Sequence, residues 1–128
     1  MNVEHLALQV TDPVGMAQWY VVNLGMRIVR QDGKPPYGHF LADGTGRVVL
    51  EIYNNPKVPV PDYWSTDPVI VHLAFATKDI PAVRSRLVEA GATNEGEIQR
   101  TDLGDEVLML RDPWGLPVQL VNRSKPMS

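Results

Sequence analysis

The sequence predicts an α+β fold made of two tandem βαβββ modules, and three observations lead to this prediction. A ten-residue segment occurs twice, at 3–12 and at 70–79, with His-Leu-Ala and an aspartate seven residues after the histidine in both copies. Each copy is followed by a helix-like segment that ends at a glycine. Short runs of valine, isoleucine and leucine, typical of strands, come next. A repeat that contains a strand, a helix and further strands indicates that one supersecondary unit occurs twice in the chain.

The first module, about 1–54, is expected to open with a strand that carries the first copy of the repeat. A helix is expected over 13–24, because Asp12 can accept hydrogen bonds from free N–H groups, Pro13 suits a first helical turn and Gly25 suits the left-handed position after a helix end. The later apolar runs predict strands at 26–31, 38–42 and 47–53.

The second module, about 69–123, repeats this order. A helix is expected over 80–90, between Asp79 and Gly91. Strands are expected at 97–101, 106–111 and 117–122. The two modules are joined at 55–68, where the prolines predict an extended connector: Pro56, Pro59, Pro61 and Pro68.

Length and composition narrow the possible functions. The 128 residues suit one domain, 1–128, or two half-domains that share a core. The sequence has no cysteine, which excludes disulfides and thiolate metal ligands. A net charge of −3 with scattered lysines and arginines argues against nucleic acid as a partner. The sequence has neither a secretory signal nor a long apolar run, so no membrane association and a cytoplasmic location are expected.

Strand alternation brings a small set of polar residues to one face. In both copies of the repeat the histidine and the alanines fall on one side of the strand, and the large apolar residues fall on the other. The fourth and eighth strands present a glutamate and a glutamine toward the same predicted inner face. The resulting set, His5, Glu51, His72 and Gln119, suits a divalent transition metal.

The chain resembles the vicinal-oxygen-chelate superfamily, which includes glyoxalase I, bleomycin resistance proteins and extradiol dioxygenases. The segments at 5–12, at 19–25 (Trp-Tyr-Val-Val-Asn-Leu-Gly) and at 112–120 (Asp-Pro-Trp-Gly-Leu-Pro-Val-Gln-Leu) carry the resemblance. It implies that the modules form a U-shaped mixed-sheet cup with the helices outside and that the protein is a homodimer. It also implies a metal held by the first, fourth, fifth and eighth strands, in the slots that here contain His5, Glu51, His72 and Gln119.

The eighth-strand slot departs from much of the superfamily. Many metal-dependent members, among them glyoxalase I and extradiol dioxygenases, carry glutamate where this chain has Gln119. Two histidines, one glutamate and one glutamine resemble the ligands of methylmalonyl-CoA epimerases, with glutamate and glutamine exchanged between the modules.

These residues predict a glyoxalase-like lyase or isomerase that acts on a small hydroxycarbonyl or dicarbonyl substrate. One divalent ion (nickel, cobalt, manganese, zinc or iron) would stabilise an enediolate. The reaction needs a base, for which Glu51 is the first candidate and His39 the second.

Two alternatives remain open. A metal-free, bleomycin-resistance-type protein would bind a small molecule with residues such as Trp64 and Trp114, and the histidines would then be structural. An iron-dependent dioxygenase is disfavoured by Gln119.

Overall fold

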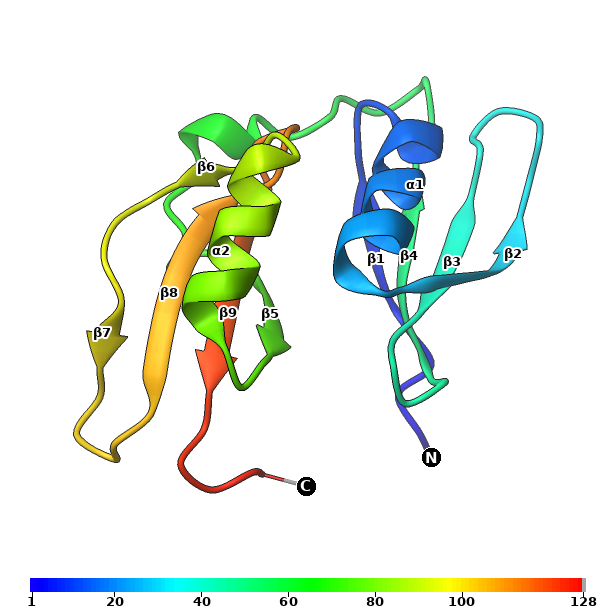
Figure 1. The fold of residues 1–128 in the computed structure, drawn as a ribbon. Helices are drawn as coiled ribbons and strands as arrows, with labels where there is room; N and C mark the ends of the chain where they lie inside the picture. The colour runs from blue at the N-terminus through cyan, green and yellow to red at the C-terminus, as the bar shows by residue number, and fades with distance from the viewer. Residues whose placement is uncertain (128) are drawn as a thin grey trace. The chain divides into compact units, whose positions relative to one another are not determined.

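The computed structural model describes residues 1–127, and the chain divides into two compact units, Met1–Pro61 and the part from Asp62 onward. In each unit one long helix lies across one face of an open, mixed sheet (Figure 1). The predicted α+β fold with a twice-used βαβββ order is confirmed. No helix in residues 1–127 is both long and apolar enough to cross a membrane.

The first unit builds a four-stranded sheet in the order β1-β4-β3-β2, with β1 and β4 parallel and the other pairs antiparallel. Leu41, Leu50 and Ile52 lie on the face that α1 covers and are almost completely buried. The elements are β1 (Leu6–Gln9), α1 (Pro13–Leu24), β2 (Arg27–Gln31), β3 (His39–Ala42) and β4 (Val48–Tyr53).

The second unit repeats this topology. Its sheet has the order β5-β9-β8-β6, with β7 also paired to β8, and β5 and β9 are parallel. Its core holds Leu87, Leu108 and Leu120, which are buried between α2 and the sheet. The elements are a 3₁₀ helix (Tyr63–Ser65), β5 (Leu73–Ala76), α2 (Ile80–Glu89), β6 (Thr93–Asn94), β7 (Gln99–Arg100), β8 (Glu106–Arg111) and β9 (Pro117–Asn122).

Both helices begin in the same way. The carboxylates of Asp12 and Asp79 accept hydrogen bonds of 3.0 Å from the backbone N–H groups of Gly15 and Ala82. These caps satisfy donors that the first helical turn leaves free, so the repeated aspartate fixes the point at which each strand gives way to a helix. Gly25 follows α1 with a φ of +67°, the left-handed conformation expected of it.

The predicted strand at 97–101 is only partly present. Residues 93–94 and 99–100 instead form two short strands, β6 and β7, whose registers on β8 differ by two residues. Gly96, with a φ of +149°, interrupts them, and its carbonyl accepts a hydrogen bond of 2.6 Å from the Asn94 side chain.

The connector at 55–68 is not simply extended, because hydrogen bonds hold it to both units. In the first unit the Gln9 amide donates to the carbonyls of Asn55 and Val58 at 2.7 and 2.8 Å. In the second, the buried Arg111 guanidinium donates to the carbonyls of Tyr63 and Thr66 at 2.7 and 3.0 Å. Arg111 also forms an ion pair with Glu95 and donates to the Gly115 carbonyl.

The two units contain equivalent tight turns, at 43–46 and at 112–115, that differ in one contact. In each turn the fourth residue is a glycine of positive φ, Gly46 at +85° and Gly115 at +92°, and its N–H donates to the carbonyl of the first, Asp43 or Asp112, at 3.0 Å. A Cβ on Gly46 would meet nothing within 4 Å, whereas one on Gly115 would lie 2.6–2.7 Å from ring atoms of Trp64. The Trp64 indole therefore rests directly on the second turn.

Candidate functional site

The first unit brings His5 and Glu51 together. Ala7 lies directly opposite Glu51 in the parallel β1–β4 pair, and His5, two residues earlier, occupies the same face. The Nε2 atom of His5 is 3.5 Å from Oε1 of Glu51, and both side chains are partly exposed. The predicted convergence of these two residues is therefore present within the first unit.

A neighbouring carboxylate orients the imidazole of His5. The Nδ1 atom of His5 is 2.8 Å from Oε1 of Glu4. Because a carboxylate can only accept, Nδ1 carries a proton and donates it to Glu4. Nε2, on the other side of the ring, faces Glu51. Metal-binding histidines are held in this way, with the second ring nitrogen donating to a carboxylate or a carbonyl.

Phe40 forms an apolar wall beside this pair. It lies opposite Glu51 in the antiparallel β3–β4 pair, and its ring stands edge-on to the His5 ring at a centroid distance of 5.2 Å. The Arg30 guanidinium carbon is 5.4 Å from the centroid of the same ring. The Glu51 carboxylate thus has an aromatic ring and a histidine as neighbours on this face.

In the second unit His72 and Gln119 occupy the equivalent positions of the strand register. Ala74 lies opposite Gln119 in the parallel β5–β9 pair, and His72 comes two residues before it. The ring is again oriented through Nδ1, which donates to the Pro68 carbonyl at 2.7 Å. Both repeated histidines lie one residue before a strand, β1 or β5, at positions that strand alternation assigns to the sheet face opposite the helix.

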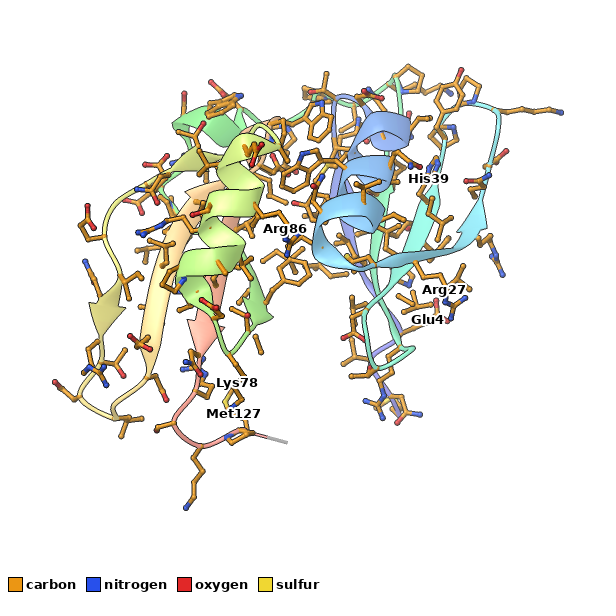
Figure 2. The ribbon with its side chains drawn as sticks, viewed as in Figure 1. Glu4, Arg27, His39, Lys78, Arg86 and Met127 are labelled. Atoms are coloured by element: carbon orange, nitrogen blue, oxygen red, sulfur yellow. The ribbon has the colours of Figure 1, made fainter. Side chains whose placement is uncertain are left out.

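His39 lies elsewhere. It pairs with Ile52 on the helix-covered face of the first sheet (Figure 2). The residue is only 4% exposed. Its Nδ1 donates to the Tyr37 carbonyl at 2.7 Å. Glu51 points to the opposite face, so the structure does not bring His39 to Glu51 as the second expected base.

Each unit thus supplies two of the four predicted ligands. Among residues 1–127 no group of three or more histidine, aspartate or glutamate side chains forms a metal-binding cluster. Sequence reasoning missed the two Nδ1 partners. Glu4 adjoins His5 in the sequence and so left a signal, whereas the Pro68 contact is made by a backbone carbonyl and left none.

Comparisons with known proteins agree with the duplicated fold. A family model described as the glyoxalase/bleomycin resistance protein/dioxygenase superfamily matches residues 2–120. The crystal structure of SMU.1112c is 30% identical, with a TM-score of 0.72 over 95% of this chain and 98% of that one. A search of curated proteins finds no match.

Two more distant structures show the fold alone. TnmS3, an antibiotic binding protein from Streptomyces sp. CB03234, is 22% identical, with a TM-score of 0.71 over 97% of both chains. A glyoxalase I mutant from Zea mays is also 22% identical, with a TM-score of 0.73. That match covers 95% of this chain but 45% of the maize chain.

Proposed function

Because the chain belongs to the glyoxalase/bleomycin resistance protein/dioxygenase superfamily, we propose that it is a divalent-metal-dependent lyase or isomerase. Its substrate is a small hydroxycarbonyl or dicarbonyl compound. The proposed ligands are His5, Glu51, His72 and Gln119, two from each unit.

The observation that carries this proposal is the orientation of the two repeated histidines. In both, Nδ1 is bound to an oxygen acceptor, so Nε2 is available as a ligand. The separation of 3.5 Å between Nε2 of His5 and Oε1 of Glu51 also fits, because metal–ligand bonds of about 2.0–2.2 Å place two ligand atoms roughly 3–3.5 Å apart. Nitrogen and oxygen donors of this kind suit nickel, cobalt, manganese, zinc or iron.

The two oxygens of Glu51 are suited to different tasks. Oε1 faces His5, whereas Oε2 points toward Gly38, which has no side chain to cover it. A bound divalent ion would polarise the substrate oxygens and stabilise the charge of an enediolate. Oε2 of Glu51 would then take the proton from the carbon next to the carbonyl group and return it to the neighbouring carbon. Phe40, which lies opposite Glu51 in the β3–β4 pair, would supply an apolar side to this site.

Metal titration tests the ligand set without depending on activity. We expect the purified protein, freed of metal, to bind about one equivalent of Ni²⁺ in calorimetry and to give a ligand-field spectrum with Co²⁺. His5→Ala and His72→Ala should each weaken binding at least tenfold. His39→Gln serves as the matched control, because it removes a histidine from the opposite face, and it should bind as the wild type does. Less than a tenth of an equivalent in the wild type would exclude the proposal.

The base is tested separately. With hydroxyacetone in D₂O and the metal-loaded protein, proton NMR should show exchange of the hydrogens next to the carbonyl group, and Glu51→Gln should abolish it. Undiminished exchange in Glu51→Gln would rule out this residue as the base.

A metal-free binding function is the second candidate, since TnmS3 shares the fold and binds an antibiotic. It predicts that the His5→Ala, His72→Ala double variant retains its small-molecule ligand. We also propose that the protein is a cytoplasmic homodimer. Light scattering should then give twice the 14.3 kDa of one chain, and a monomer mass would contradict the dimer.

A further inference from the structure

A half-open pocket of about 360 Å³ lies within the second unit, and the proposed chemistry does not use it. Its volume falls in the range of small-molecule sites. It is lined by Ala74, Ala76, Thr77, Lys78, Val121, Asn122, Arg123, Pro126 and Met127. All of these residues belong to β5, β9 and the segments that follow them.

The floor of the pocket is apolar and made of small residues. Ala76 pairs with Val121 in the β5–β9 register, on the sheet face opposite α2. The alanine side chains leave the space that a larger residue would fill, and Pro126 and Met127 also line the pocket. This floor suits an alkyl chain or an aromatic ring.

The rim of the pocket is positively charged. Within residues 1–127 no carboxylate is paired with the Lys78 ammonium group, which lies near Met127 (Figure 2). Arg123 is held by Asp105 at 3.1 Å, and Asp105 also accepts the Ser124 N–H at 2.8 Å. The Arg123–Asp105 pair is close to neutral, so Lys78 leaves the rim with about one net positive charge.

The nearby acidic groups are already engaged. Glu106 contacts the Asn122 amide at 3.5 Å and the Arg100 guanidinium at 3.7 Å. Asp79 caps α2 through the Ala82 N–H. These interactions hold the two carboxylates outside the pocket lining.

We propose that this pocket binds a small amphiphilic monocarboxylate. The apolar body would lie over Ala74, Ala76 and Val121, and the carboxylate would meet Lys78 and Arg123. His72 occupies the same face, four residues before Ala76, or about 13 Å along a strand. If the proposed function holds, the substrate is an elongated acid whose reactive end reaches His72. This inference about the substrate rests on the proposed function, whereas the proposed binding of a carboxylate in the pocket does not.

The test uses 4-phenylbutyrate, with 4-phenyl-1-butanol as the neutral analogue, and metal-free protein. Methyl NMR titrations should show shifts at Ala74, Ala76 and Met127, and the acid should bind about fivefold more tightly than the alcohol. Lys78→Met should remove this preference, because it deletes the charge and keeps an apolar stem. Lys34→Met, an exposed lysine of the first unit, should leave the preference unchanged.

A cavity-filling variant tests the location. Ala76→Phe should weaken the binding of both compounds at least tenfold, and the smaller Ala76→Val should weaken it less. Equal affinities for acid and alcohol, or equal effects of Lys78→Met and Lys34→Met, would overturn the proposal. Carboxylate binding in a protein that takes up no metal would uphold this pocket and exclude the proposed lyase function.

Discussion

Replacing Gly115 by alanine should destabilise the second unit more than the equivalent change, Gly46→Ala, destabilises the first. Both glycines end equivalent turns with similar positive φ values, so alanine meets a comparable backbone cost of about 1–2 kcal/mol at each. Only at Gly115 does the new methyl group collide with the ring of Trp64.

The size of the additional effect follows from the burial of Trp64. The residue is 50% exposed, so about 100 Å² of the roughly 200 Å² that a tryptophan can bury is at risk. At about 25 cal/mol per Å², displacement of the ring costs up to about 2.5 kcal/mol. We expect a loss of about 2–4 kcal/mol for Gly115→Ala and about 1–2 kcal/mol for Gly46→Ala.

Urea denaturation followed by far-UV circular dichroism measures both losses. A double-mutant cycle isolates the collision, because in a Trp64→Ala background Gly115→Ala should cost no more than Gly46→Ala. Equal losses for the two glycine variants in the wild-type background would refute the argument that the indole makes this glycine necessary.

Three further predictions concern the metal ligands and the effect of pH. Glu4→Ala should weaken Ni²⁺ binding about tenfold by calorimetry, because it frees Nδ1 of His5; the exposed Glu97→Ala is its control, and equal effects would contradict this role. Gln119→Glu should strengthen Ni²⁺ binding, since it adds a charged ligand, and weaker binding in this variant would argue against Gln119 as a ligand. The Ser124 N–H, followed by the Arg123 guanidinium, lowers the pKa of Asp105 from its ordinary 3.8. The ionised form of Asp105 therefore stabilises the fold at pH values above 3.8. This stability is lost as the pH falls through the lowered pKa. Thermal melting of Asp105→Asn should depend less on pH below about 4 than that of the wild type, and parallel curves would count against this reasoning.

The duplicated fold could be predicted because its signals are local. Asp12 and Asp79 cap the helices from adjacent positions in the chain, and Gly25 ends α1 where its conformational freedom is needed. The pairing of His5 with Glu51 was also accessible, because strand alternation assigns both residues to one face.

The position of His39 could not be predicted, because the face it occupies depends on the register of β3 against β4. His39 pairs with Ile52, a core residue of β4, and this long-range pairing places it on the helix-covered face. The division of the expected strand 97–101 had the same origin, since it depends on how the chain around Gly96 meets β8. Such long-range pairings leave little trace in the local sequence.

The different partners of the two Nδ1 atoms make the imidazoles chemically unequal. His5 donates to the negatively charged side chain of Glu4, whereas His72 donates to a neutral peptide carbonyl at Pro68. An anionic acceptor increases the electron density on the ring more than a neutral one does, so the two Nε2 atoms would differ as electron donors to a metal ion. A single nucleotide change can alter the partner of His5, whereas the orientation of His72 follows the path of the backbone and withstands most substitutions nearby. The two histidines occupy equivalent positions, yet they differ in how readily a mutation can change the partner of Nδ1.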